Sequence, residues 1–333
     1  MYPFLHPDNA AKVSIRFIDI VNDPSTSSNF KQILSLCGFV IVTDVLSAEE
    51  IATAQEYWAK DLQCIMDIEA SKDKILAASV YQDPVHTWPS KVPLGQPVEF
   101  GLAQGQLAWY IRRNSNIRHC FEIVHDTEHL CVGTDSIMFS REPPPKLRKS
   151  WGHVDYHRDL IHHECFQSIV YLMDTEEESS TTVVWPGSHL SHFDTVMEAN
   201  APRLFSTIPA SMVPEYEANA VRLKIPKGAM VLWNSKLVHQ GHNWGRRLAV
   251  PVCFEPSVLR TREVLQLKQE LVENGMSGTH WAAIFHTHAK TRAKGNKPKE
   301  LQRDVGPFRL HHRAHLHLLD ESGFLKDDYA ALL

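Results

Sequence analysis

The spacing of apolar residues changes twice along the chain. Between Trp151 and Pro256, short apolar runs are separated by turn residues, as in FQSIVYLM, TTVVWPG, VRLKIPKG, AMVLWNS and RLAVPVCFEP. Short strands at this spacing are typical of an all-β sandwich or barrel. Before Trp151 and after Pro256, most apolar residues recur at helical intervals. The pattern therefore predicts a β core with helices before and after it.

Capping and turn residues mark the ends of several of these elements. Residues 38–45 are predicted to form a strand, and Ser47 with Glu50 then forms a Ser-x-x-Glu capping box that opens a helix. That helix is expected to continue to about Ala70. The amphipathic stretch that follows the β core is expected to end at Gly275.

We expect one domain over residues 1–333, because no internal repeat and no low-complexity linker divides the chain. Its parts would be a mostly helical N-terminal region (1–130), the β core (131–256) and a helical C-terminal extension (257–333). The predicted fold class is α+β, mainly β in its core.

The composition is that of a globular protein and disfavours several other classes. Hydrophobic residues make up 43% of the chain and charged residues 22%, and the net charge of -5 gives no general attraction to nucleic acid or anionic membranes. The six cysteines contain no Cys-x-x-Cys pair, which indicates reduced cytosolic thiols. We find no secretory signal and no apolar run long enough to span a bilayer, so we expect a cytoplasmic protein.

The stretch WGHVDYHRDL contains two overlapping His-x-Asp pairs, His153/Asp155 and His157/Asp159. In an extended strand, all four side chains would project to the same side. Two imidazoles and two carboxylates on one face are unusual in a structural core and indicate a metal site. Their spacing alone does not decide which pair binds the metal.

A third ligand follows the predicted buried strand in PKGAMVLWNSKLVHQG, where His239 emerges at the far end. Two imidazoles and one carboxylate form the facial triad of non-haem Fe(II) oxygenases, which leaves three coordination positions open. A 2-oxo acid can take two of these positions and O2 the third. Zinc also fits the ligand types, but its catalytic sites more often use three histidines or two histidines with Glu.

A 2-oxoglutarate cosubstrate also needs a cation for its distal carboxylate, and arginine binds a carboxylate through two parallel hydrogen bonds. Arg246 and Arg247 open the strand that follows His239. Alternation along that strand puts Arg247 on a face with small residues, which leaves room for a ligand: Ala249, Pro251 and Cys253. We therefore expect Arg247 to bind the cosubstrate, the alternative being a surface arginine pair at a strand start.

Together these motifs resemble the phytanoyl-CoA dioxygenase-like family of Fe(II)/2-oxoglutarate oxygenases, in particular its eukaryotic and viral branch. The shared stretches appear in the family's order over roughly residues 38–281: GFVIVTDVLSAEEI, WGHVD, FQSIVYL, WPGSH, LWNSKLVHQG, RLAVPVCFEP and SGTHW. Each stretch alone is weak, and the ordered combination carries the resemblance. It implies a jelly-roll core, also called a double-stranded β-helix, and a dioxygenase that uses Fe(II), 2-oxoglutarate and O2.

The resemblance also favours one of the two His-x-Asp pairs. In this family Trp-x-His-x-Asp closes a strand, and a loop leads to a next strand that often begins with Gln. Trp151, His153, Asp155 and Gln167 fit that arrangement, which would leave the second pair in the loop. Gln167 is then expected either to reach the cosubstrate or to be an inward polar residue of the core.

Several further residues have two interpretations. Trp233 is expected to be core packing rather than a substrate platform, and His189 in WPGSH either contacts the substrate or stabilises a turn. His157 and His242 are candidates for acid/base or substrate roles. In the family the distal arginine lies a few residues further from the histidine, so the loop that leads to Arg247 is shorter here.

The predicted function is an Fe(II)- and 2-oxoglutarate-dependent dioxygenase that hydroxylates a C–H bond of a small organic metabolite and releases succinate and CO2. The carboxylate of Asp155 argues against a halogenase, because related halogenases lack it. Two alternatives stay open: oxidative demethylation of a modified nucleobase, which the basic stretch 290–299 would assist, and a non-catalytic jelly-roll binding protein. The expected partner is a small molecule, with no membrane, and nucleic acid is disfavoured by the net charge.

Overall fold

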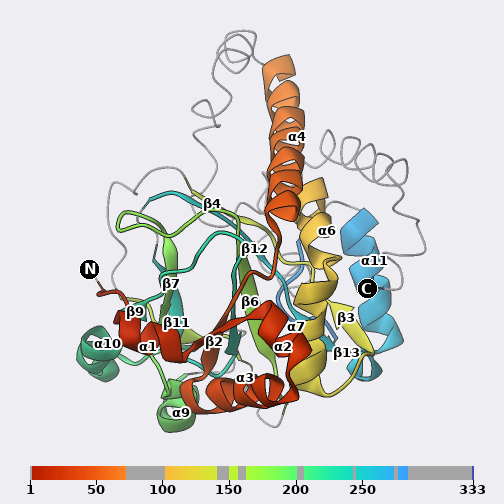
Figure 1. Cartoon of the computed structure of the whole chain (residues 1–333). Coiled ribbons are helices and arrows are strands. Elements are labelled where there is room, and N and C mark those ends of the chain that lie inside the picture. Colours follow the sequence, from red (N-terminus) through yellow and green to blue (C-terminus); the bar gives the residue numbers. More distant parts are fainter. Residues whose placement is uncertain are drawn as a thin grey trace. The chain divides into compact units, whose positions relative to one another are not determined.

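A computed structural model describes residues 2–72, 102–140, 150–156, 163–200, 206–242, 245–273, 277–283 and 332–333. The helices and strands described below are labelled in Figure 1. The chain divides into two compact units: the first combines Met1–Ser47 with Phe139–Ala249, and the second combines Ala48–Met138 with Val250–Leu333. The one-domain organisation expected from the sequence stays a prediction.

The first unit is built around two β-sheets. The larger, six-stranded sheet has the order β1-β2-β10-β6-β12-β4. β10 is antiparallel to both β2 and β6, whereas β1 runs parallel to β2. The strands are β1 (Ser14–Arg16), β2 (Phe39–Thr43), β10 (Met230–Asn234), β6 (Phe166–Tyr171), β12 (Arg247–Pro251) and β4 (Met138–Ser140).

The smaller, five-stranded sheet has the order β8-β5-β11-β7-β9, and its strands pair antiparallel. The strands are β8 (Ser206–Thr207), β5 (His153–Val154), β11 (His239–His242), β7 (Thr181–Val184) and β9 (Val221–Arg222). The runs FQSIVYLM, TTVVWPG, AMVLWNS and RLAVPVCFEP contain β6, β7, β10 and β12. The predicted α+β fold, with a β core and flanking helices, is thus confirmed.

The inner faces of the two sheets meet at a hydrogen bond between Tyr171 and Thr182. Tyr171 ends β6 and Thr182 lies in β7, and their hydroxyl oxygens are 2.8 Å apart. Because side chains alternate along a strand, Gln167 and Ile169 share the inner face of the larger sheet with Tyr171. By the same alternation, Val184 shares the inner face of the smaller sheet with Thr182. All five side chains are buried.

Helix α3 (Pro24–Cys37) packs against β2 and shows how its ends are set by sequence. The carboxylate of Asp23 accepts the backbone N–H of Ser25 at 2.9 Å, which caps the first turn. Gly38 ends the helix in the left-handed region, with φ of +83°, and β2 begins one residue later. The other helices of this unit are α1 (Pro7–Lys12), α2 (Phe17–Asn22), α8 (Ser188–Ser191), α9 (Phe193–Glu198) and α10 (Val213–Asn219), with the 3-10 helix Ala210–Met212.

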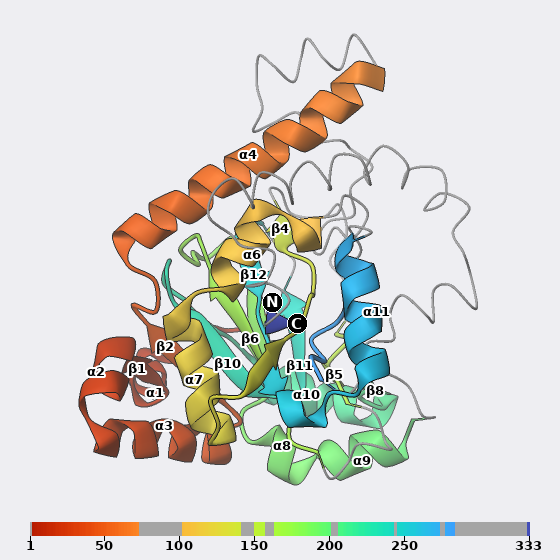
Figure 2. The ribbon, with the colours of Figure 1, turned by 90° about the vertical axis from the view of Figure 1, so that its right-hand side faces the viewer.

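The second unit is mainly helical in the part that the structure describes (Figure 2). Its long helix α4 (Ala48–Lys72) begins directly after Ser47, as the capping box predicts. The buried carboxylate of Asp61 accepts the N–H groups of Gln106 and Leu107, both at 3.0 Å, and so caps α6 (Gln106–Arg112). Other elements are α7 (Ser115–His125), α11 (Arg262–Glu273), the antiparallel pair β3 (Leu130–Val132) and β13 (Phe254–Pro256), and the 3-10 helices Leu102–Gln104 and Ser257–Leu259.

One predicted strand is shorter than the sequence pattern indicates. The predicted ribbon around the His-x-Asp pairs contains only the two-residue strand β5, and Asp155 follows it. His157 and Asp159 lie outside the described residues, as does the basic stretch 290–299.

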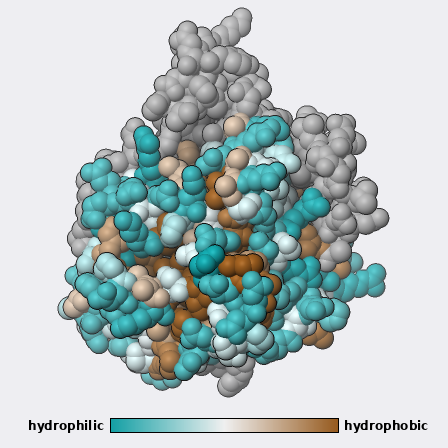
Figure 3. Space-filling model, in the orientation of Figure 1, coloured by the Kyte–Doolittle hydropathy of each residue, from teal (hydrophilic) through white to brown (hydrophobic). Residues whose placement is uncertain are grey.

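The surface displayed in Figure 3 is mostly hydrophilic, with apolar residues gathered near its middle. The exposed large apolar residues include Ile18 and Val21 on α2 and Leu36 on α3. Among the described helices, none has the length and hydropathy that a membrane span requires.

Gly38 and Gly187 provide a matched pair for testing this packing, because both have a positive φ, +83° and +76°. A Cβ on Gly38 would lie 2.6 Å from His189 Nδ1 and 2.6 Å from Leu237 Cδ1, whereas a Cβ on Gly187 would meet nothing within 4 Å. We expect Gly187→Ala to cost about 1–2 kcal/mol of unfolding free energy from the backbone alone. Gly38→Ala should cost roughly 1–3 kcal/mol more from the overlap. Urea denaturation of both variants measures the difference, and equal losses would contradict the described contacts.

Candidate metal centre

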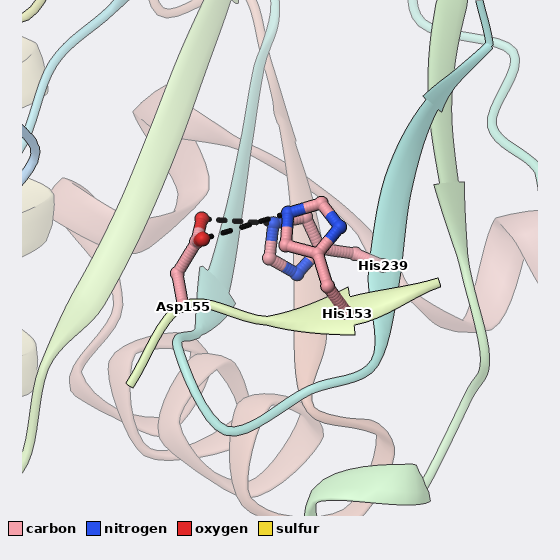
Figure 4. A group of neighbouring side chains, drawn as sticks. All are labelled: His153, Asp155 and His239. Atoms are coloured by element: carbon pink, nitrogen blue, oxygen red, sulfur yellow. Dashed lines mark ion pairs between the residues drawn. The ribbon is translucent and has the colours of Figure 1, made fainter. Parts of the chain in front are cut away.

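His153, Asp155 and His239 converge between the two sheets of the first unit (Figure 4). His153 in β5 and His239 in β11 are register partners across an antiparallel pair, so their side chains project to the same side. Asp155 faces both: its Oδ1 lies 3.5 Å from His153 Nε2, and its Oδ2 lies 3.3 Å from His239 Nε2. One ligand atom from each of the three residues lies within 4.8 Å of the others. Both histidines are buried and Asp155 is half-buried.

Both imidazoles are oriented by the same backbone interaction. Nδ1 of His153 lies 3.2 Å from the carbonyl oxygen of Trp151, and Nδ1 of His239 lies 2.9 Å from that of Leu237. A carbonyl only accepts, so each Nδ1 carries the proton and donates it. The lone pair of each neutral ring is then on Nε2, the atom that faces Asp155. The two rings are therefore fixed in the tautomer that a metal requires.

Aromatic side chains pack against both imidazoles. The ring of Trp151 is stacked on His153 with centroids 4.6 Å apart and an interplanar angle of 13°. The ring of Trp233 lies 5.2 Å from His239 at 57°. Between Trp151 and His153, Gly152 carries no side chain because a Cβ there would lie 2.8 Å from the ring of Tyr216. This packing leaves the imidazoles little rotational freedom.

The side chain of Gln240 joins the two strands that carry the histidines. Its Oε1 accepts the backbone N–H of Trp151 at 3.1 Å, and the hydroxyl of Tyr2 lies 3.5 Å from the same oxygen. Gln240 directly follows His239 and is buried. Since the carbonyl of Trp151 orients His153, Gln240 acts on that imidazole through the backbone of Trp151, whose N–H it holds.

Arg247 lies buried at the start of β12, whereas its neighbour Arg246 is exposed. Nη2 of Arg247 donates to the hydroxyl of Tyr171 at 2.9 Å and approaches Oγ1 of Thr182 at 3.5 Å. Its Nε is buried without a hydrogen-bond acceptor among the described residues, and no carboxylate of those residues forms an ion pair with it. The guanidinium thus lies between the sheets, with donor capacity left for a ligand.

Arg247 and the triad lie in the same inner space, the space between the two sheets. They lie at neighbouring levels, which are positions counted along the strands. Thr182, which contacts Arg247, lies two residues from Val184, and Val184 is the register partner of His239. At about 3.3 Å per residue, the two levels are roughly 7 Å apart along the strand. A short dicarboxylic acid can therefore reach both.

The remaining residues singled out in the sequence have varied surroundings. Gln167 is buried on the inner face, and its Nε2 donates to Oγ of Ser235 at 3.2 Å. Nε2 of His189 lies 2.9 Å from the carbonyl oxygen of Ser35, so this histidine joins α8 to the end of α3. Burial, together with the nearby Lys236 charge, lowers the pKa of His189 below its ordinary value. The second His-x-Asp pair and the side chain of His242 lie outside the described residues.

Some residues of the site lie inside the quoted sequence stretches but were not singled out as functional residues. Gln240, Tyr171 and Thr182 act through partners on other strands, and only the strand register brings those partners together. For Tyr171 and Thr182 the sequence contained an indication. Both lie on predicted strands, at positions whose side chains alternate toward the inner face.

The donor set fits a divalent metal. Two imidazole nitrogens with one carboxylate on one side of an ion constitute the facial triad of mononuclear iron sites, which keeps coordination positions open. Among the described residues, this is the one group of three or more His, Cys, Asp or Glu side chains close enough to bind a metal together.

Comparison with protein families matches residues 34–244, well over half of the chain, to the family described as Phytanoyl-CoA dioxygenase (PhyH). The matched range contains His153, Asp155 and His239, and Arg247 lies three residues beyond its end (247 − 244 = 3). A search of curated protein sequences found no significant match.

Several solved structures are similar to this chain. The GlcNAc inducible gene 2 protein GIG2 (DUF1479) from Candida albicans has a TM-score of 0.55 and 12% identity, covering 95% of this chain and 87% of that chain. A hypothetical protein from Escherichia coli has a TM-score of 0.53 and 10% identity, covering 88% and 84%. EctD from S. alaskensis, solved with 2-oxoglutarate and 5-hydroxyectoine, has a TM-score of 0.45 and 14% identity, covering 79% and 85%. At such identities the first two likenesses show a shared fold and nothing about activity.

Gln240→Leu removes the acceptor that holds the Trp151 peptide. We expect the affinity for Mn(II), measured by isothermal titration calorimetry, to fall roughly 10-fold or more, because groups that orient metal ligands typically contribute 10–100-fold. Gln240→Glu keeps an oxygen at the same position and should restore much of the affinity. An unchanged Mn(II) affinity in folded Gln240→Leu would show that the peptide is held by other means.

Proposed function

Because the chain belongs to the phytanoyl-CoA dioxygenase (PhyH) family, we propose that it is an Fe(II)- and 2-oxoglutarate-dependent dioxygenase. It oxidises a C–H bond of a small organic metabolite and releases succinate and CO2. Hydroxylation is the expected outcome. The observation that carries this proposal is the buried group His153, Asp155 and His239. These three residues would hold the iron, and the two facing sheets would form the jelly roll around it.

The metal-binding group suits iron better than a structural ion. Both Nε2 atoms face the carboxylate, and no cysteine belongs to the group. A closed cysteine-rich site would leave no position for other ligands, whereas a facial triad leaves several. Catalytic zinc more often has three histidines, or two histidines with Glu.

The surroundings of Arg247 suit the distal carboxylate of 2-oxoglutarate. A buried guanidinium without an anionic partner is costly, because burial removes its hydration. The distal carboxylate of a ligand would supply that partner and accept from Nε, which has no acceptor among the described residues. The hydroxyls of Tyr171 and Thr182 hold the guanidinium at the position where this carboxylate would lie.

When bound, iron and 2-oxoglutarate activate O2 for attack on a C–H bond, which no side chain of the protein can do alone. The protein's own contribution is to place and shield the reacting groups. Trp151 and Trp233 pack against the imidazoles and exclude water from one side of each ring. The Nδ1 bonds to backbone carbonyls keep both rings from turning.

His153→Ala tests the metal ligands directly. In the presence of Fe(II), 2-oxoglutarate and air, we expect succinate formation to fall to background in His153→Ala, because one of the three ligands is lost. His157→Ala is the matched control, since it removes the histidine of the other His-x-Asp pair, and it should keep wild-type activity. If succinate formation is lost only in His157→Ala, the metal is assigned to the second pair, His157/Asp159. A wild-type protein that binds Fe(II) and 2-oxoglutarate but never forms succinate would favour the non-catalytic binding protein.

Arg247→Met tests the cosubstrate site. Charged hydrogen bonds contribute about 1.5–3 kcal/mol, so we expect the KM for 2-oxoglutarate to rise roughly 10- to 100-fold. Arg246→Met is the matched control, because it removes an exposed guanidinium one residue away, and its KM should be that of the wild type. A larger effect from Arg246→Met would assign the cosubstrate to the other arginine.

A further inference from the structure

The indole N–H of Trp233 is a buried donor without an acceptor among the described residues. Its side chain is 3% exposed, so water does not solvate it freely. A buried donor that lacks a partner costs about 1–3 kcal/mol, and such groups are rare in native proteins. Core packing alone, the role expected from the sequence, would be filled equally well by phenylalanine. The indole nitrogen therefore requires its own explanation.

Trp233 lies on the inner face of the larger sheet, next to the triad. It is the register partner of Gln167, which shares the inner face with Tyr171. Its ring lies 5.2 Å from that of His239, which belongs to the smaller sheet. The ring is therefore in the space between the sheets, at the level of the triad rather than that of Arg247.

Most of the other polar side chains of this inner space have partners. Tyr171 and Thr182 hydrogen-bond to each other and to Arg247, and the amide nitrogen of Gln167 donates to Ser235. Two N–H groups then lack acceptors among the described residues, Nε of Arg247 and Nε1 of Trp233. They lie at neighbouring levels of the space, so a ligand with acceptor oxygens at both of its ends would satisfy both.

We propose that Nε1 of Trp233 donates a hydrogen bond to the carboxylate of the 2-oxo acid end of the cosubstrate, the end that lies at the triad. This inference rests on the proposed function and deepens it, because it assigns a second donor to the same ligand. Trp233 is then a binding residue rather than packing. Arg247 recognises one end of the acid and Trp233 the other.

The test is the affinity of the Mn(II)-loaded protein for 2-oxoglutarate, measured by calorimetry so that no turnover is needed. Trp233→Phe removes the N–H and keeps an aromatic ring, and we expect the Kd to rise roughly 10-fold, the effect of one hydrogen bond to a charged acceptor. Because the phenylalanine ring still packs against His239, the variant should bind Mn(II) without acid with a Kd that changes less than the Kd for 2-oxoglutarate, which also reports that it is folded. Trp185→Phe is the matched control, because it shortens another buried tryptophan, one that contacts His192 and Tyr216, and it should bind 2-oxoglutarate as the wild type does.

Pyruvate, a 2-oxo acid without a distal carboxylate, distinguishes the contribution of the 2-oxo acid end of the ligand from that of the distal end. Its affinity should fall in Trp233→Phe by the same factor as that of 2-oxoglutarate, and it should be insensitive to Arg247→Met. Equal 2-oxoglutarate affinity in wild type and Trp233→Phe would overturn the inference, and so would a loss that spares pyruvate. A wild-type protein that binds Mn(II) but no 2-oxo acid would overturn the proposed function as well. Loss of Mn(II) binding in folded Trp233→Phe would show that the indole supports the metal ligands rather than the acid, and would also overturn the inference.

Discussion

The pairing of His153 with His239 across β5 and β11 is the constraint on which the rest of the site depends. Opposite residues of an antiparallel pair share a face, and a register shift of one residue would turn one imidazole away. β5 is only two residues long, so its own ladder cannot fix that register. The bond from the Trp151 N–H to Gln240 and the packing of Tyr216 against Gly152 add the fixation that the short strand lacks. The candidate ligands are thus positioned by contacts of the residues next to them in sequence.

The inner space between the sheets combines two kinds of surroundings. At the level of the triad, the Asp155 carboxylate lies beside two imidazole nitrogens, a set of donors that suits a cation. Two residues further along β7, Arg247 supplies positive charge with no carboxylate partner among the described residues, which suits an anion. A metal and an acid that binds to it would match both sets of groups. A buried guanidinium without an anionic partner is costly, so its presence favours a binding site over a structural core.

Residue types and alternation made part of this site predictable. The His-x-Asp pairs and His239 indicate a metal site because such residues are rare in apolar strands, although only the family resemblance favours His153/Asp155 over the second pair. Arg247 is preferred over Arg246 because its face carries small residues. Strand pairing was not predictable, because partners such as Gln240 and the Trp151 peptide are 89 residues apart and local pattern does not encode register. His189 illustrates the same limit: its contact with the carbonyl of Ser35 joins residues 154 positions apart, which its local motif does not encode. The short length of β5 was not predictable, because a His-x-Asp-x-His pattern is compatible with an extended backbone whether or not that backbone pairs with another strand.

The short connection between His239 and Arg247 has a physical explanation in Gly245. A Cβ on this residue would lie 1.9 Å from the carbonyl oxygen of Glu178, so no other residue allows the chain to pass there. Its carbonyl accepts the hydroxyls of Ser140 at 2.6 Å and of Ser180 at 2.8 Å, and its N–H donates to Ser180 at 3.1 Å. These bonds hold the backbone two residues before Arg247. Close backbone approach at Gly245 therefore holds the start of β12 at the position from which Arg247 enters the space between the sheets.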